Sequence, residues 1–196
     1  MDEIKQTLEK QKQDKGGKFG VHINIFGSKG SGKTFKAIKI TKECFKKPLV
    51  YYMSDDFNNL DVAIFKPNNY REDLEEFLKN AVKLAKARKI DALIFDEADL
   101  LFPMSKPLLP IMKELIDKHR HMFCSLLFIS RRPQNINSLI AEEGHFNIIF
   151  AIEGDNVTRK LNSVRKGYGD LVQQLVYKSY NYVFKELGKE PEIRKD

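Results

Sequence analysis

The chain has 196 residues, of which 42% are hydrophobic and 31% charged, and its formal net charge at pH 7 is +7. This length and apolar content predict one folded domain and exclude a disordered chain. The longest apolar runs, such as "ALIF" and "IIFAI", are far too short to cross a membrane, so no membrane insertion is expected. Two cysteines, Cys44 and Cys124, are too few for a disulfide framework or a zinc site, which favours a cytoplasmic setting.

The chain begins with a charged stretch and then alternates apolar runs with amphipathic ones. Residues 1–18 predict a solvated helix or arm, residues 19–188 a single domain, and residues 189–196 a charged tail. Buried strands are expected at residues 21–26, 48–54, 90–95, 125–130 and 146–152. Helices are expected at residues 33–45, 71–88 and 106–119, in "NSLIAEE", and on either side of Gly167 and Gly169. The segment "YNYVFKEL" predicts a late edge strand or hairpin partner.

Near-continuous apolar strands that alternate with helices predict an α/β fold. Such strands belong to a mainly parallel sheet that is covered by helices on both faces, in three layers α/β/α. Ligands of these sheets bind beyond the carboxyl ends of the strands. Gly27, Ser54, Asp96 and Ser130 all fall at such ends. We therefore expect the functional site at this edge of the sheet.

A glycine-rich segment, "FGSKGSGKTF" at residues 26–35, follows the first predicted strand directly. It contains the pattern G-x-x-x-x-G-K-[ST] at Gly27, Gly32, Lys33 and Thr34. In this pattern backbone N–H groups cradle phosphates, the lysine reaches the outer phosphates and the hydroxyl binds Mg²⁺. The residues expected to contact the nucleotide are Gly27, Ser28, Lys29, Gly30, Ser31, Gly32, Lys33 and Thr34. An ordinary glycine-rich turn is the alternative, but the strand–loop–helix context favours a nucleoside triphosphate site.

Two acidic residues, Asp96 and Glu97, follow the predicted strand at 90–95 in "ALIFDEAD". An acid at this position holds Mg²⁺ opposite the phosphate loop, and Asp96 suits that role, together with Thr34. Its neighbour Glu97 is suited to orient or deprotonate the attacking water. Acids also favour solvated helix starts, which is the alternative interpretation. A helicase of the type that the letters "DEAD" suggest needs two such cores and about twice this length.

The combined motifs resemble a known family. Lys33 and Thr34, the Asp96–Glu97 pair, and a polar strand end at Ser130 followed by "RRPQNI" resemble the additional-strand, catalytic-glutamate branch of P-loop ATPases. Within that branch the chain is most similar to the FtsK–HerA superfamily of DNA-pumping and viral genome-packaging ATPases. The resemblance implies a RecA-like sheet with core strand order 5-1-4-3-2, and it implies ATP and Mg²⁺ as cofactors. It further implies double-stranded DNA as partner, a homo-oligomeric ring expected to be a hexamer, and a site of action in a host cytoplasm or at a virion.

Arginines after the fourth predicted strand are candidate catalytic groups. The family places glutamine, arginine and proline there, with the glutamine sensing the γ-phosphate, whereas this chain has Arg131, Arg132 and Pro133. The sensor therefore stays open between Ser130 and Arg131. An arginine finger supplied across a subunit boundary is expected to be Arg131 or Arg132. Arg88 is the next candidate and Arg120 the weakest.

Basic residues in two loops are candidate DNA contacts. The loop at residues 100–107 contributes Lys106, and the stretch at residues 157–169 contributes Arg159, Lys160, Arg165 and Lys166. Each of these could equally belong to an ordinary solvated loop. The predicted function is an ATP-hydrolysing motor that translocates or packages DNA. The alternatives are a small-molecule, nucleoside-type kinase or another AAA+-like ring ATPase. A GTP switch is disfavoured because no guanine-reading Asn-Lys-x-Asp segment follows a late strand.

Overall fold

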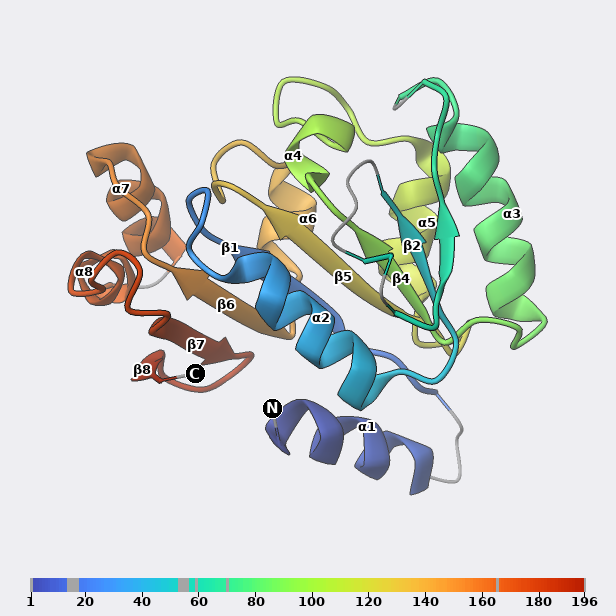
Figure 1. Ribbon diagram of the computed structural model, residues 1–196, viewed down its shortest axis with the longest axis horizontal. Helices are drawn as coiled ribbons and strands as arrows, with labels where there is room; N and C mark the ends of the chain where they lie inside the picture. The colour runs from blue at the N-terminus through green and yellow to red at the C-terminus, as the bar shows by residue number, and fades with distance from the viewer. Residues whose placement is uncertain are drawn as a thin grey trace.

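A central sheet organises the molecule (Figure 1). The computed structural model describes residues 2–13, 18–52, 57–58, 60–69, 71–164 and 166–195, and these contain one sheet of eight strands. The strand order is β3-β2-β4-β5-β1-β6-β7-β8. The strands are β1 (His22–Phe26), β2 (Pro48–Tyr51), β3 (Ala63–Phe65), β4 (Ala92–Phe95), β5 (Ser125–Ser130), β6 (Phe146–Phe150), β7 (Tyr182–Glu186) and β8 (Glu192–Arg194).

Helices cover both faces of the sheet and complete three layers. The helices are α1 (Asp2–Gln13), α2 (Lys33–Cys44), α3 (Leu74–Lys86), α4 (Ala98–Leu101), α5 (Pro110–Lys118), α6 (Ser138–Glu142), α7 (Asp155–Val164) and α8 (Tyr168–Gln173). One hydrophobic cluster includes Ile4 and Ile40, and it joins α1 and α2 to one face. A second cluster includes Leu78, Leu115 and Leu161, and it joins α3, α5 and α7 to the other face. The predicted three-layer α/β/α fold is confirmed.

Strands in the middle of the sheet bury both of their faces. In β5, Leu126 and Phe128 belong to the second of these clusters, whereas Leu127 and Ile129 belong to the first. All four side chains are buried. Because no position along the strand faces solvent, the usual alternation of apolar and polar residues is absent, and an unbroken apolar run replaces it.

The order of the core strands agrees with the order that the resemblance implied. Strand β1 pairs in parallel with β5 on one side and with β6 on the other, and β4 lies between β5 and β2. The five predicted strands therefore lie in the order 5-1-4-3-2. Since all five run parallel, their carboxyl ends meet at one edge of the sheet.

The structure extends the sheet beyond the predicted core at both sides. Strand β3 lies in a region where no strand is expected from the sequence, and it pairs in parallel with β2. On the other side, β7 pairs antiparallel with β6, and β8 pairs antiparallel with β7. The segment expected to be a charged tail, residues 189–196, thus contributes a strand to the sheet. Residues 192–194 complete a hairpin, which their charged composition conceals.

Helix α5 begins later than the sequence predicts. The expected start was Lys106, whereas the helix begins at Pro110. Leu109 has ψ of 138°, an extended conformation that a following proline favours. Proline at the first helical position loses no intrahelical hydrogen bond, so Pro110 sets the boundary of the helix.

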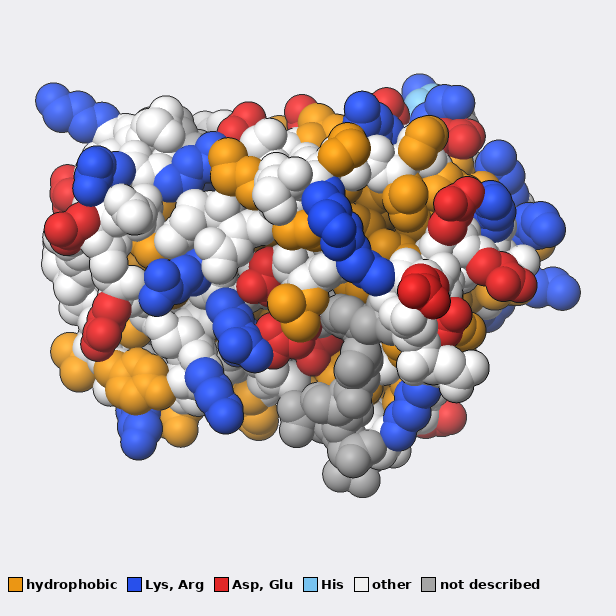
Figure 2. Space-filling view, turned by 90° about the horizontal axis from the view of Figure 1, so that it is seen from above, with side chains coloured by type: hydrophobic (Ala, Val, Ile, Leu, Met, Phe, Trp, Pro, Cys, Tyr) orange, Lys and Arg blue, Asp and Glu red, His pale blue; other side chains and the backbone are white. Residues whose placement is uncertain are grey.

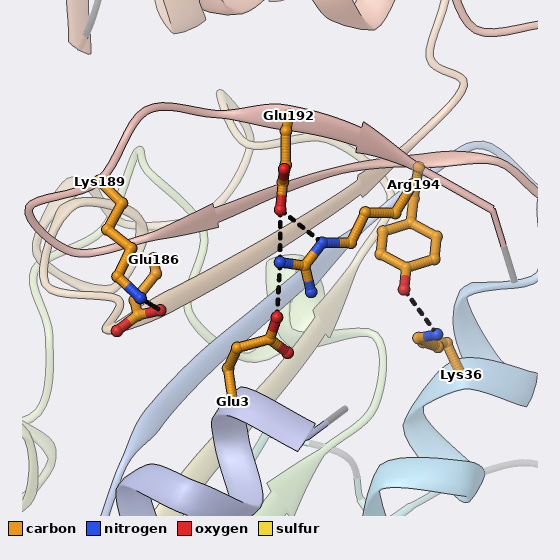
Figure 3. A network of polar contacts seen from close by, with 7 residues as sticks. Glu3, Lys36, Glu186, Lys189, Glu192 and Arg194 are labelled. Atoms are coloured by element: carbon orange, nitrogen blue, oxygen red, sulfur yellow. Dashed lines mark hydrogen bonds and ion pairs between the residues drawn. The ribbon is translucent and has the colours of Figure 1, made fainter.

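An ion-pair network attaches α1 to the C-terminal hairpin (Figure 3). Arg194 in β8 lies 2.7 Å from the Glu3 carboxylate, also pairs with Glu192, and its guanidinium stands 3.9 Å from the centroid of the Phe184 ring. The hydrogen bond from Arg194 lowers the pKa of Glu3 to about 2. Ile4 and its neighbours on the same helix face are buried. Residues 2–13 of the charged N-terminal segment thus form a helix that packs on the domain through this face.

Both cysteines are free thiols. Cys124 is buried at the start of the fourth core strand and Cys44 is half-buried at the end of α2. Burial raises the pKa of both thiols, to about 11 for Cys44. In the part of the chain that the structure describes, none of the helices combines the length and apolarity needed to cross a bilayer.

Three histidines meet at the amino-terminal edge of the sheet. The rings of His22 and His119 are 6.5 Å apart between centroids, and those of His119 and His145 are 5.7 Å apart. The His145 Nδ1 atom accepts a hydrogen bond from the backbone N–H of His22. Burial lowers the pKa of His22 to about 3 and that of His119 to about 4. The native protein therefore holds both rings in their neutral form at neutral pH.

We expect the free energy of unfolding to fall as the pH drops from 6.5 to 4. Below pH 6.5 the unfolded chain protonates both His22 and His119, whereas the folded chain does not, so acid favours unfolding. Two such protons correspond to a slope of up to about 3 kcal/mol per pH unit. Urea unfolding at several pH values measures the slope. His119→Gln should make the slope clearly smaller but should not abolish it, because burial also lowers the pKa of His145. The matched change at exposed His121 should leave the slope unchanged, and an equal slope in both variants would contradict this assignment.

Candidate nucleotide-binding site

A cleft of about 540 Å³ lies at the carboxyl edge of the core strands. The lining residues come from the loop after β1, from α2, from the segment after β4 and from the segment before β7. They are Lys29, Gly30, Gly32, Lys33, Thr34, Phe35, Ile38, Asp96, Glu97 and Tyr180. The structure thus brings the predicted phosphate loop and the predicted acid pair into one cleft.

Backbone hydrogen bonds hold the phosphate loop against the neighbouring strands. The N–H of Gly27 donates to the carbonyl of Ser130, at 3.2 Å, and the N–H of Ser28 donates to the carbonyl of Ala151, at 3.3 Å. A Cβ atom on Gly27 would lie 2.3 Å from the Ser31 hydroxyl. Gly32 has φ of +100°, a left-handed conformation that other residues rarely adopt. Glycine is therefore required at both ends of the loop, and the loop is held in place before any ligand binds.

The first turn of α2 supplies the positive end of the site. The helix begins at Lys33, so its first backbone N–H groups have no acceptors within the helix and carry the positive end of the helix dipole. The Lys33 side chain lines the cleft and is 8% exposed, so its ammonium group lies in a partly dehydrated setting. An anion such as a triphosphate is stabilised by both features.

The acid pair lies directly beyond β4. Asp96 is 7% exposed and lines the cleft with Thr34. Glu97 has φ of 47° and ψ of 45°, a left-handed conformation at the start of α4 that costs on the order of 1–3 kcal/mol in a non-glycine residue. This conformation turns the chain sharply and leaves both carboxylates in the cleft. Strain of this kind is found at functional sites.

Thr34 and Asp96 suit a magnesium ion that is bound together with a nucleotide. Among the described residues no group of three or more His, Cys, Asp or Glu side chains could hold a metal by itself. Mg²⁺ is usually held by one or two carboxylates, by substrate phosphates and by water. The donor set of one hydroxyl and one carboxylate fits this pattern, and the ion would neutralise charge between the β- and γ-phosphates.

Arg131 forms a two-pronged ion pair with Glu97. Its Nε atom donates to Oε2 of Glu97 at 3.1 Å, and its Nη2 atom donates to Oε1 at 3.2 Å. This pairing raises the pKa of Arg131. Ser130 is fully buried, and its hydroxyl donates to the carbonyl of Arg132 at 3.4 Å, away from the cleft lining. Of the two sensor candidates, Arg131 is therefore the one that contacts the acid pair.

The other arginine-finger candidates lie elsewhere. Arg132 is exposed just past β5. Arg88 precedes β4 and stands over the Phe123 ring at 4.0 Å, and Arg120 precedes β5, where its carbonyl accepts the N–H of Phe19. Because Arg88 and Arg120 lie at the amino ends of their strands, they are at the edge opposite to the cleft of their own chain.

The candidate DNA loops have different environments. Lys106 is exposed, in a loop that is tied to the segment after β5 by hydrogen bonds from Met104 N–H to the carbonyl of Asn135 and from Asn137 N–H to the carbonyl of Phe102. Lys160 in α7 pairs with Glu142 at 3.0 Å, whereas Arg159 and Lys166 are exposed. Arg165, like the strand-end residue Ser54, lies outside the described residues.

Three cleft residues were not predicted from the sequence. Phe35 and Ile38 follow the phosphate-loop pattern within α2, and Tyr180 comes from the segment between α8 and β7. Phe35 carries a weak signal in the sequence, since an aromatic residue directly follows the motif. In the structure its side chain is 64% exposed. Tyr180 carries none, because its position depends on the antiparallel pairing of β7 with β6.

Comparisons with known proteins agree with this geometry. The family described as "ATPase family associated with various cellular activities (AAA)" matches residues 23–154. The genome packaging NTPase B204 from Sulfolobus turreted icosahedral virus 2, in complex with ATP-gammaS, has a similar structure, with a TM-score of 0.77 and 16% identity over 89% of this chain and 97% of that chain. No curated protein sequence matches the chain.

Two further solved structures are similar. The N-terminal domain of zonular occludens toxin from Neisseria meningitidis has a TM-score of 0.57 and 11% identity over 90% of this chain and 94% of that chain. EssC (ATPases 2 and 3) from Geobacillus thermodenitrificans has a TM-score of 0.60 and 11% identity over 89% of this chain and 39% of that chain. At these identities the likeness concerns the fold, and it confirms the RecA-like architecture.

The predicted P-loop ATPase is confirmed by the family match, and these neighbours share its fold. Its nucleotide motifs lie within the matched region, at Gly27 to Thr34 and at Asp96 and Glu97. Because the match covers well over half of the 196 residues, this chain belongs to the AAA family of ATPases.

Proposed function

We propose that this ATPase is a DNA-translocating motor that works as a ring of identical subunits and that moves or packages double-stranded DNA. The observation that supports it most is the cleft in which the phosphate loop faces Asp96 and Glu97, with Arg131 paired to Glu97. The similarity of fold to a genome packaging NTPase, over nearly the full length of that protein, also supports the proposal of a DNA motor. A motor of this kind would act in a host cytoplasm or at a virion.

The residues of the cleft divide the work of hydrolysis. Lys33 and the first turn of α2 hold the phosphates, and Thr34 and Asp96 hold Mg²⁺ with them. Glu97 takes a proton from the attacking water. Before that, its two oxygens are occupied by Arg131, so the ion pair has to open or shift for Glu97 to act as a base. Arg131 then becomes available to stabilise charge on the γ-phosphate.

Hydrolysis could be transmitted to the loop at residues 100–107 through the same ion pair. Glu97 stands at the start of α4, and the last residues of that helix, Leu100 and Leu101, begin this segment. Arg131 stands on the segment after β5, which is bonded to the loop through Asn135 and Asn137. A change in the ion pair therefore moves two segments that both hold the loop bearing Lys106. Figure 2 looks onto the molecule from above and shows Lys and Arg side chains distributed over this face, with acidic side chains between them.

ATP hydrolysis measured with and without double-stranded DNA tests the proposal. We expect DNA to stimulate hydrolysis and the active species to be an oligomer in size-exclusion chromatography. Lys33→Ala should lower the turnover by roughly 10²–10³-fold, because the phosphates lose a charge that lies in a partly dehydrated cleft. Lys42, which is exposed in the same helix, provides the matched control, Lys42→Ala, which should keep its activity. Hydrolysis unaffected by DNA, together with transfer of phosphate to a nucleoside, would indicate the kinase alternative instead.

DNA binding should be independent of sequence and should weaken steeply with salt. Each lysine or arginine that contacts a phosphate contributes about 0.9 to the slope of log K against log salt concentration. Lys106→Ala should reduce the slope by about 1, whereas Lys189→Ala, at the distant β7–β8 turn, should leave it unchanged. Fluorescence anisotropy of a labelled duplex at several salt concentrations measures both slopes. Equal slopes in the two variants would remove Lys106 from the DNA interface.

A further inference from the structure

The cleft has an apolar wall beside its phosphate-binding groups. Phe35, Ile38 and Tyr180 form this wall. The rings of Phe35 and Tyr180 are large and substantially exposed, at 64% and 53%. Exposed aromatic side chains that line a cleft are a cost to the unliganded protein, and they are typical of sites that receive a flat apolar ligand. The phosphates do not require such groups.

The Tyr180 ring lies directly against the phosphate loop. A Cβ atom on Gly32 would come within 2.8 Å of the Cδ1 atom of Tyr180, so the ring packs on the backbone just before Lys33. This is the point where the loop turns into α2. A ligand whose phosphates occupy the loop therefore has its remaining part within reach of this ring.

Contacts on both sides of Tyr180 hold its segment in place. Three residues earlier, the Tyr177 hydroxyl donates to the carbonyl of Lys29 at 2.5 Å. Two residues later, Tyr182 in β7 accepts a hydrogen bond from the Lys36 ammonium at 2.9 Å and packs on the Phe150 ring. Tyr180 itself has φ of 58°, a conformation that a non-glycine residue keeps only when its surroundings impose it. The segment is thus anchored to the phosphate loop, to α2 and to β6.

We propose that Phe35 and Tyr180 form a platform on which the base of a nucleoside triphosphate stacks, and that this platform accepts all four common bases. This inference rests on the assignment of the cleft to a nucleoside triphosphate. Among the described residues, the polar groups of the cleft lining are the phosphate-loop residues, the acid pair and the Tyr180 hydroxyl, and the first two groups are assigned to the phosphates and the metal. Selection of one base requires hydrogen bonds to its edge, whereas every base has a face that stacks.

Equilibrium binding tests the platform without depending on hydrolysis. Isothermal titration calorimetry with Mg²⁺ compares ATP, GTP, CTP and UTP with inorganic tripolyphosphate, which has no base. We expect the four nucleotides to bind within about tenfold of one another. Tyr180→Ala should weaken all four by roughly 5- to 100-fold, the range for loss of one base–aromatic stack, and should leave tripolyphosphate binding unchanged. Tyr180→Phe should bind nucleotides as tightly as the wild type, because phenylalanine keeps the ring.

Matched variants separate stacking from a structural effect. Phe35→Ala should show the same pattern as Tyr180→Ala, and Leu187→Ala, an equally exposed apolar residue beyond β7, should change nothing. Loss of tripolyphosphate binding in Tyr180→Ala would overturn the platform, since the residue would then act through the phosphate loop. A preference of more than about tenfold for one base would also overturn it. If the wild-type protein binds neither nucleotides nor tripolyphosphate, the triphosphate site itself fails.

Discussion

Glu97→Gln lowers the turnover of ATP by roughly 10²–10⁴-fold, the loss expected when a general base is removed. The amide keeps the shape of the side chain and keeps one oxygen that accepts a hydrogen bond from Arg131, but it cannot take a proton from water. The dissociation constants of ATP and Mg²⁺ should stay near the wild-type values, because Lys33, Thr34 and Asp96 are unchanged. Asp96→Asn should instead weaken the Mg²⁺-dependent part of ATP binding.

Single-turnover hydrolysis and nucleotide binding, measured on the same protein, separate the two carboxylates. Glu153→Gln makes the same chemical change at an exposed position after β6, and it should keep wild-type turnover. Normal hydrolysis by Glu97→Gln would mean that another carboxylate acts as the base. Asp99, the next acid of α4 and largely buried, would then be examined first.

Arginine variants should show the largest losses, and mixing them with Glu97→Gln should separate Arg131 from Arg132. An arginine that stabilises the transferred phosphoryl group contributes roughly 10³–10⁵-fold to the rate. Arg131 pairs with Glu97 of its own chain, so we expect it to act in cis. Arg132 is exposed one residue further from β5, so we expect it to act on a neighbouring subunit.

The mixing experiment combines two inactive proteins and measures ATPase activity. Glu97→Gln mixed with Arg132→Ala should regain activity, because some interfaces then combine an intact Glu97 with an intact Arg132. Glu97→Gln mixed with Arg131→Ala should stay inactive, because neither subunit carries both groups. Arg71→Ala, at an exposed position before α3, should remain fully active by itself. A wild-type rate per subunit that is independent of protein concentration, from a protein that stays monomeric with nucleotide and DNA, would contradict the ring.

The Arg131–Glu97 pair illustrates why the sequence left the sensor open. Each residue was predicted as a site residue from its own strand end, but the two are 34 positions apart. Their contact depends on the pairing of β4 with β5, which brings the two strand ends to the same edge. The side chains of the two adjacent residues, Ser130 and Arg132, point away from Glu97, because successive side chains at a strand end alternate in direction.

The sequence by itself determined the parts of this protein whose interactions are local. The phosphate loop depends on glycines and a helix start within eight consecutive residues, Gly27 to Thr34, and buried strands follow from unbroken apolar runs. Both signals lie within single segments, so no knowledge of the fold is needed to find them. The same holds for the acid pair, which directly follows its strand.

Only the tertiary structure decided the contacts between distant segments. The charged composition of residues 2–13 and 192–194 suggests solvation, yet Arg194 joins Glu3 to the hairpin and Ile4 is buried beneath it. Tyr180 lies 148 positions after Gly32 and reaches the cleft only because β7 turns back along β6. Contacts of this kind depend on which faces pack together and not on residue spacing, so a periodic pattern does not encode them.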